Sequence, residues 1–104
     1  MINIIKRIVP KSKYSIKCPN AMTPSRIVVH NTANDATARN EIDYMTRNND
    51  ETSFHYAVDD KEIVQGIEEN RNSWNAGDGN GKGIREGIAI DICYSKSGGE
   101  WFLK

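Results

Sequence analysis

The chain has 104 residues, the size of one small domain whose hydrophobic core is limited. Its 14 lysines and arginines balance 14 aspartates and glutamates, so the formal net charge is zero. This balance gives no general attraction to nucleic acid or to an anionic membrane, and we expect neither as a partner. No apolar run approaches the length of a membrane span, and the first residues lack the long apolar region of a secretory signal. We therefore expect synthesis in the cytoplasm without a signal peptide.

The first third of the chain leads to one apolar strand. Residues 2–9 are mostly apolar and predict a short strand or an arm laid across the domain, which Pro10 ends. Residues 10–25 contain three prolines among polar residues and predict a loop. Residues 26–30 include three consecutive β-branched side chains, which predict a buried strand with His30 at its C-terminal end. Since α/β sheets usually bind ligands at this end of a strand, His30 is a candidate site residue.

The middle of the chain predicts one helix and one hairpin. Thr37 is suited to cap a helix, and apolar residues recur after it at helical spacing, so we expect a helix over residues 37–47. Residues 53–58 alternate between two faces and predict a half-buried strand. A turn at residues 59–61 leads to a third strand over residues 62–67. We expect this strand to pair antiparallel with the second.

The last third of the chain predicts a fourth strand after a glycine-rich stretch. Residues 68–72 are charged and predict a single helical turn. Residues 77–87 are rich in glycine, but no Gly-Lys-Ser/Thr follows, so they predict a surface loop rather than a phosphate-binding loop. Residues 88–94 predict the strand, with isoleucines on one face. The two cysteines lie far apart and predict reduced thiols, either of which could bind a metal.

Three polar side chains stand at strand positions where their chemistry matters. Asp91 lies among isoleucines, and a carboxylate in a buried strand is costly unless it is paired or placed at a cleft. It is therefore either functional or the ion-pair partner of a base such as Arg85. His30 is either a metal ligand or a hydrogen-bonded structural group. His55 either faces the same cleft or lies on the surface of its strand.

Four stretches of the sequence resemble the motifs of one family, in the same order and with compatible spacing. They are residues 28–32 (VVHNT), 53–60 (SFHYAVDD), 73–79 (SWNAGDG) and 90–99 (IDICYSKSGG). The first is similar to the first zinc-ligand motif of the type 2 N-acetylmuramoyl-L-alanine amidases. That class includes phage endolysins and is related to the peptidoglycan-recognition proteins. The other three resemble its central hairpin, its Trp-His-Ala-Gly region and the strand that carries its catalytic acid.

The resemblance implies a fold and a mechanism. The fold is an α/β domain of the three-layer type, with a mixed sheet and flanking helices. The mechanism uses a zinc ion, which lowers the pKa of a bound water, and an acid that passes the proton to the leaving amine. The bond cleaved joins N-acetylmuramic acid to L-alanine, so the expected partners are peptidoglycan and its muropeptides. By resemblance, His30 is the first zinc ligand and Asp91 the catalytic acid, and the substrate groove is lined by Asn31, His55 and Trp74.

Three departures from the family pattern qualify this assignment. Asn75 stands where the family has the histidine of its Trp-His pair. Asp91 replaces a glutamate, which retracts the carboxylate by on the order of 1 Å, and such a misplacement can cost about 100-fold in rate. The family's second histidine ligand and its cysteine follow a C-terminal helix that begins near residue 102, so two of three zinc ligands are missing. His55 and Cys93 are the substitutes that can be tested.

Two main functional hypotheses remain. In the first, residues 1–104 are the N-terminal part of an amidase catalytic domain without the C-terminal helices, active when a second polypeptide supplies the missing ligands. In the second, the chain is a non-catalytic remnant of a prophage amidase that at most binds peptidoglycan fragments. An unrelated small binding protein is disfavoured by the ordered motifs. Either form would act at the cell wall, and the uncovered apolar sheet face would favour self-association.

Overall fold

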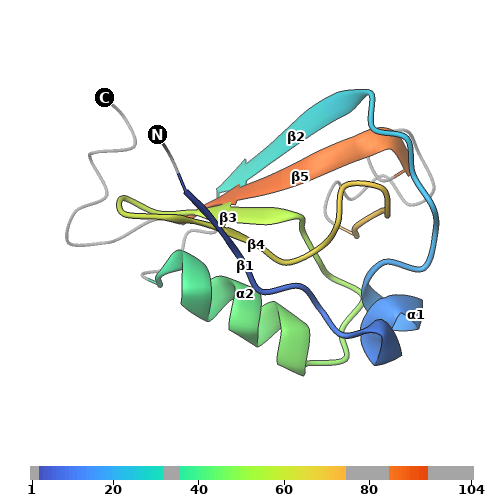
Figure 1. The fold of residues 1–104 in the computed structure, drawn as a ribbon, viewed down its shortest axis with the longest axis horizontal. Coiled ribbons are helices and arrows are strands. Elements are labelled where there is room, and N and C mark those ends of the chain that lie inside the picture. Colours follow the sequence, from blue (N-terminus) through green and yellow to red (C-terminus); the bar gives the residue numbers. More distant parts are fainter. Residues whose placement is uncertain (1–2, 32–35, 75–84, 94–104) are drawn as a thin grey trace.

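Five strands form one mixed sheet that packs on a helix (Figure 1). The computed structural model describes residues 3–31, 36–74 and 85–93. The strands are β1 (Ile4–Lys6), β2 (Arg26–Asn31), β3 (Tyr56–Val58), β4 (Ile63–Gln65) and β5 (Gly87–Ile92). The helices are the short 3-10 helix η1 (Lys11–Lys13), α1 (Tyr14–Lys17) and α2 (Ala38–Arg47). Among the described residues, no helix has the length and apolar character to cross a membrane.

The strand order is β1-β4-β3-β5-β2. β3 and β4 pair antiparallel, which confirms the predicted hairpin, whereas β5 runs parallel to both β2 and β3. β1 runs parallel to β4 and forms one edge of the sheet. The register of β2 and β5 sets His30 directly beside Asp91, and Asp91 lies beside Ala57 of β3. The predicted α/β class is therefore confirmed, and the topology brings two of the expected site residues together.

Helix α2 forms where the sequence predicts it, because its start signal is local. The Thr37 hydroxyl oxygen accepts a hydrogen bond from the Asn40 backbone N–H at 3.1 Å, which satisfies one of the free donors of the first turn. Ile42 and Met45 of α2 are buried in the core that the helix forms with the sheet. Gly66 permits this close approach, since a Cβ there would lie 2.9 Å from the ends of both side chains.

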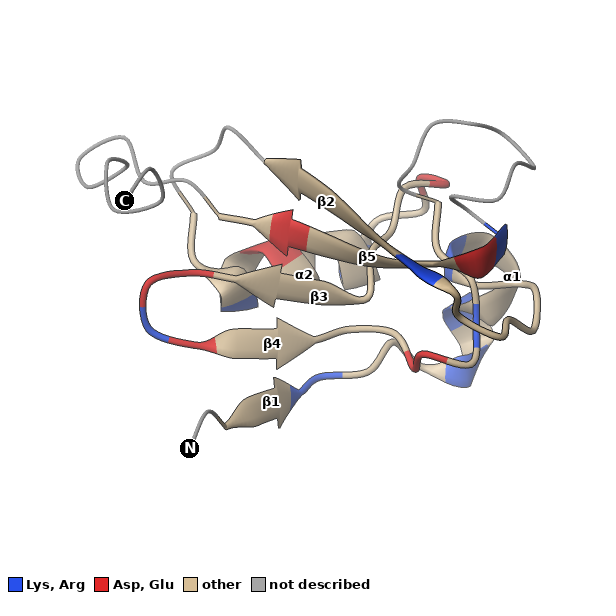
Figure 2. Ribbon diagram, turned by 90° about the horizontal axis from the view of Figure 1, so that it is seen from above, with Lys and Arg blue, Asp and Glu red and all other residues tan. Residues whose placement is uncertain are grey.

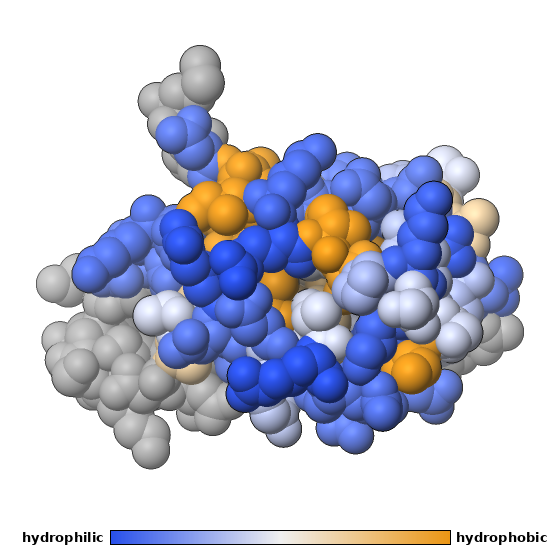
Figure 3. All heavy atoms as spheres, turned by 60° about the horizontal axis from the view of Figure 1, so that its bottom comes forward, coloured by the Kyte–Doolittle hydropathy of each residue, from blue (hydrophilic) through white to orange (hydrophobic). Residues whose placement is uncertain are grey.

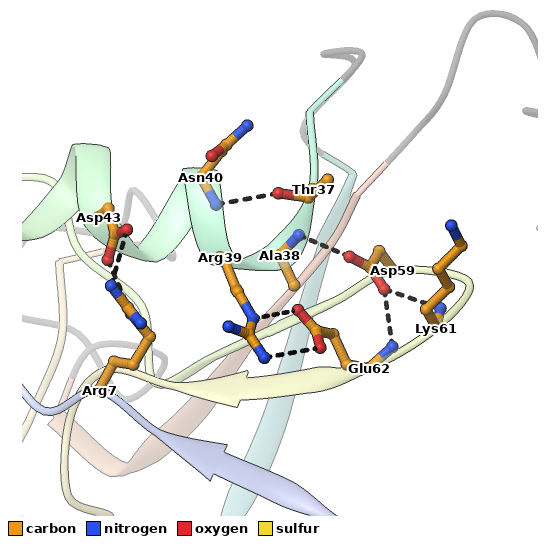
Figure 4. Close-up of polar contacts among 9 residues, drawn as sticks. All are labelled: Arg7, Thr37, Ala38, Arg39, Asn40, Asp43, Asp59, Lys61 and Glu62. Atoms are coloured by element: carbon orange, nitrogen blue, oxygen red, sulfur yellow. Dashed lines mark hydrogen bonds and ion pairs between the residues drawn. The ribbon is translucent and has the colours of Figure 1, made fainter.

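Asp59 joins the start of α2 to the β3–β4 turn (Figure 4). One carboxylate oxygen accepts the backbone N–H groups of Lys61 at 2.8 Å and Glu62 at 2.7 Å, and the other accepts that of Ala38 at 2.8 Å. Burial alone would raise the pKa of Asp59, but these three donors and the Lys61 charge hold it below its ordinary value. The ion pair of Arg39 with Glu62 adds to this contact, and a second ion pair, Arg7 with Asp43, joins the end of β1 to α2.

The two faces of the sheet differ in what covers them. Val64, Ala57 and Ala89 lie in the core on the face toward α2. Side chains alternate along a strand, so their neighbours point away from α2. Figure 2, seen from above, shows no described helix in front of this second face. We call it the upper sheet face; its apolar members include Ile4, Ile27, Val29, Ile63, Ile88, Ile90 and Ile92.

The structure corrects three expectations drawn from the sequence. Residues 10–25 are not all loop, since they contain η1 and α1. Residues 68–72 contain turns but no helix. β2 lies at an edge of the sheet among the described strands, and it is not buried, since Ile27 is 65% and Val29 is 59% exposed on the upper sheet face. The expectations for residues 77–84, for Asn75 and for the last residues of the chain lie outside the described residues.

Candidate functional site

A pocket of about 230 Å³ lies between the C-terminal ends of β2 and β5 and helix α2. The sheet contributes His30 and Asp91, and the helix contributes Glu41, Tyr44 and Met45. Seen from the side of α2, the surface of the domain is mainly hydrophilic, with a few separate apolar patches (Figure 3). The pocket places two titratable groups of the sheet within reach of a ligand.

His30 and Asp91 form the centre of this pocket. Nδ1 of His30 lies 3.9 Å from Oδ1 of Asp91, which is too long for a hydrogen bond but close enough for a charged pair when the imidazole is protonated. The His30 side chain is 61% exposed, whereas that of Asp91 is 9% exposed. The sheet thus presents an accessible imidazole beside a shielded carboxylate, a pair that can bind a polar ligand and exchange a proton with it.

The described residues do not by themselves fit a zinc site. A catalytic zinc ion is held by three protein ligands, and the described part of the chain contains no group of three histidine, cysteine or acidic side chains placed to hold a metal. Cys93 is a poor substitute. Burial, with the charges of Glu41, Asp59 and Asp91, raises the pKa of its thiol to about 12, so it is not a ready thiolate ligand. Both cysteines are free, as predicted, and both are buried.

His55 has a structural role, which corrects both expectations for it. Its side chain is fully buried, so it lies neither in the pocket nor on the surface. Nδ1 accepts the Ala89 backbone N–H at 2.9 Å, and Nε2 lies 2.7 Å from the Arg71 carbonyl oxygen, to which it donates in the neutral tautomer. Burial lowers the pKa of His55, although the Arg71 carbonyl and the Glu69 charge oppose the shift. The imidazole therefore connects β5 to residues 66–74 and has no nitrogen left for a ligand.

The other two predicted groove residues do not line this pocket. Trp74 is half-buried near α1, where its indole N–H donates to the Ile16 carbonyl at 2.9 Å and its backbone N–H donates to the Ser53 hydroxyl oxygen at 2.9 Å. Asn31 is exposed at the end of β2, next to His30 in the sequence. Its backbone continues the pairing with β5. A groove that includes either side chain would have to extend beyond the pocket.

Sequence reasoning missed the wall of the pocket opposite the sheet. Glu41 and Tyr44 lie three residues apart on α2, and Asn48 follows four residues later. Residues with this spacing share one face of a helix, so the predicted helix contained the signal for part of this wall. Asp50 and Thr52 complete the wall from an irregular segment, for which periodicity gives no signal.

The family model for N-acetylmuramoyl-L-alanine amidase, Amidase_2, matches residues 20–103. The chain belongs to this family, which confirms the expected relationship. Among curated relatives, the amidases CwlA and XlyB of Bacillus subtilis (strain 168) are 60% and 58% identical to it over 99 residues. These matches cover 94% of this chain but 36% and 31% of the relatives, so the chain spans about a third of their length.

Solved structures agree with this assignment. PlyL superposes with a TM-score of 0.91 at 58% identity, covering 95% of this chain and 62% of PlyL. A mutant endolysin from Bacillus subtilis superposes with a TM-score of 0.81 at 45% identity, covering 89% of this chain and 62% of the endolysin. The chain therefore shares the fold of these two solved proteins, over about three fifths of their length.

Proposed function

We propose that this chain is the N-terminal part of a peptidoglycan hydrolase domain, a zinc-dependent N-acetylmuramoyl-L-alanine amidase that acts on the cell wall. The observation that carries the proposal is the pocket in which β2 and β5 bring His30 and Asp91 together. Membership of the amidase family supports the substrate class, since the relatives' own names specify N-acetylmuramoyl-L-alanine.

The two central side chains have distinct proposed roles. His30 is the one imidazole exposed in the described pocket, so it is the group that would contribute a metal ligand. Asp91 is shielded and lies beside it, which suits a carboxylate that holds and releases a proton at a bound substrate. Since the described residues contain no group of three donors placed to hold a metal, the remaining ligands of a zinc site would have to come from outside them.

A second candidate function is binding without cleavage. It is favoured by the lack of a three-donor metal cluster among the residues that the structure describes. The pocket and the fold would then serve to bind muropeptides, with His30 and Asp91 as polar contacts. The two candidates differ in their requirement for metal and in the product they release.

Metal content and product analysis distinguish the two candidates. The purified chain, alone and mixed with a polypeptide that supplies the remaining ligands, is dialysed against zinc, its metal content is measured by elemental analysis, and it is then incubated with purified cell walls. Stoichiometric zinc, lost in His30→Ala, together with released peptides that begin with L-alanine, would establish the amidase. Absence of zinc and of released peptide, with retained binding of N-acetylmuramoyl-L-alanyl-D-isoglutamine, would establish the binding function for this chain.

A further inference from the structure

Lys17, the last residue of α1, is fully buried. Its ammonium group donates hydrogen bonds to Asn48 Oδ1 at 2.7 Å, to the Asp50 carbonyl at 2.6 Å and to the Thr52 carbonyl at 3.1 Å. A buried charge without partners is strongly unfavourable, so an ammonium in this place requires such acceptors. Burial lowers the pKa of Lys17, and the Asp50 charge opposes that shift.

All three acceptors belong to one segment, residues 48–52, which we call the pocket wall. Asn48, Asp50 and Thr52 line the pocket that contains His30 and Asp91. The pocket wall has neither helical nor strand pairing, so its shape depends on side-chain contacts. Asn48 Oδ1 also accepts the Asp50 backbone N–H at 3.0 Å, which closes a turn around the same oxygen that Lys17 binds. Three residues of the pocket wall therefore bind the same ammonium group of Lys17.

We propose that Lys17 is a positioning residue of the pocket, which holds the pocket wall in place opposite His30 and Asp91 and so sets the shape available to a ligand. Its own side chain is fully buried, so it acts through Asn48, Asp50 and Thr52 and does not touch the ligand. The identity of that ligand as a muropeptide rests on the proposed function. The effect of Lys17 on the pocket wall does not depend on the proposed function.

Two neighbouring residues provide matched controls. Lys13 donates to the Arg47 and Asn48 carbonyls at 3.3 Å and 3.0 Å and to Asn49 Oδ1 at 2.7 Å, so it stabilises the end of α2 from outside. These bonds reach only the first two residues of the pocket wall, whereas Lys17 also binds the carbonyls of Asp50 and Thr52. Ser53 is buried and its hydroxyl donates to the Lys17 carbonyl at 2.6 Å. Replacing it perturbs the same region without removing an ammonium contact to the pocket wall.

The first test measures the pocket wall by amide hydrogen exchange in the full chain. In Lys17→Met, which retains length and apolar bulk but has no donor, the Asp50 amide should exchange about tenfold faster than in the unmodified chain. Amides of β3, β4 and β5 should keep their exchange rates, as should the Asp50 amide in Lys13→Met. An unchanged Asp50 amide in folded Lys17→Met would overturn the proposal.

The second test measures affinity for N-acetylmuramoyl-L-alanyl-D-isoglutamine by NMR titration. Lys17→Met should weaken binding about tenfold, while Lys13→Met and Ser53→Ala should stay within about twofold. An equal loss in Ser53→Ala would assign Lys17 a merely structural role. If the unmodified chain does not bind this probe, the proposed function fails, whereas the exchange measurement still decides the role of Lys17.

A measurement on the unmodified chain covers the case in which Lys17→Met does not fold. The ammonium protons of Lys17 should exchange with water more slowly than those of Lys61, because they are buried and bound to three oxygens. A slow ammonium signal that shifts together with the Asn48 side-chain amide on titration of the probe supports the proposal. A Lys17 ammonium that exchanges as fast as that of Lys61 overturns it.

Discussion

The two histidines of the chain occupy opposite environments, and this difference decides which of them can do chemistry. His30 exposes its imidazole at the pocket, 3.9 Å from the Asp91 carboxylate. His55 is enclosed, and backbone groups of Ala89 and Arg71 occupy both of its nitrogens. Both histidines lie within predicted strands, so the sequence pattern alone does not distinguish their environments. The difference between the two environments arises because residues 66–74 pack over the beginning of β3 and enclose His55.

His55 should make the stability of the domain sensitive to acid. Its pKa in the folded chain lies below the ordinary value of 6.5, so folding favours the neutral imidazole. The contribution of His55 to the stability of the folded chain is complete at pH values above 6.5. It is lost as the pH falls through the lowered pKa of the folded chain. Urea unfolding at about pH 7.5 and about pH 5 should show a loss of stability in the unmodified chain and in His30→Gln, but a smaller loss in His55→Gln. Equal losses in all three would contradict this role.

Asp91 should limit the rate of any zinc-competent form of the domain. Its carboxylate is one methylene shorter than that of a glutamate, so Asp91→Glu should raise activity once the missing ligands are supplied in trans. Asp91→Asn, which cannot take up a proton, should lower it by about 100-fold or more with little change in muropeptide affinity. Both are measured as released peptide per unit time. If Asp91→Glu leaves the rate unchanged, the reach of the acid is not limiting.

Helix α2 is fixed to the domain at both ends by groups from distant parts of the chain. At its start, Asp59 accepts the Ala38 backbone N–H, and at its end Lys13 binds the Arg47 and Asn48 carbonyls. Glu41 and Tyr44 of the helix line the pocket, Ile42 is buried in the core, and Met45 belongs to both surfaces. The position of the helix therefore determines the distance between Tyr44 and the strand-borne pair.

Asp59→Ala should destabilise the domain by about 1–3 kcal/mol, because three backbone donors lose their acceptor. The neighbouring exposed Asp60 provides the control, and Asp60→Ala should stay within about 0.5 kcal/mol of the unmodified chain. The folded pKa of Asp59 is lowered, so the difference between the variants should be present at neutral pH and shrink as acid protonates the carboxylate. Urea unfolding of both variants at two pH values measures this.

The elements that the sequence predicts well are those with local signals. Helix α2 follows from the Thr37 cap and its apolar spacing, and the β3–β4 hairpin follows from its turn. Helices η1 and α1 are not predicted, because the prolines at positions 10, 19 and 24 indicate a loop, although residues 11–18 contain none. The parallel pairing of β2 with β5 has no local signal, since these strands are far apart in the sequence. His30 and Asp91 were both predicted, but the pocket wall depends on Lys17 and was not.

At the scale of the whole molecule, the sheet is covered unequally. Helix α2 packs on one face, while the upper sheet face exposes Ile27 and Val29 over the described residues (Figures 1 and 2). Contiguous apolar surface of this kind favours association with another chain or segment. The upper sheet face is therefore the surface on which the expected self-association would occur.

Self-association should weaken when the upper sheet face is made polar. The double variant Ile27→Ser with Val29→Thr should sediment as a smaller species than the unmodified chain at the same concentration. Tyr44→Ser, which removes an exposed aromatic from the α2 side, should leave the sedimentation unchanged. Identical behaviour of the double variant and the unmodified chain would exclude this face as the contact.

The pairing of β2 with β5 also governs when the pocket first exists. Among the described strands β2 pairs with β5 alone, and the two strands are separated by α2, β3 and β4 along the chain. During synthesis His30 emerges long before Asp91, and closing so long a loop is a slow step in folding. A ribosome-bound or partly folded chain can therefore form the helix and the hairpin while His30 still lacks its carboxylate. Any activity or binding at the pocket would begin only when the last described strand has docked.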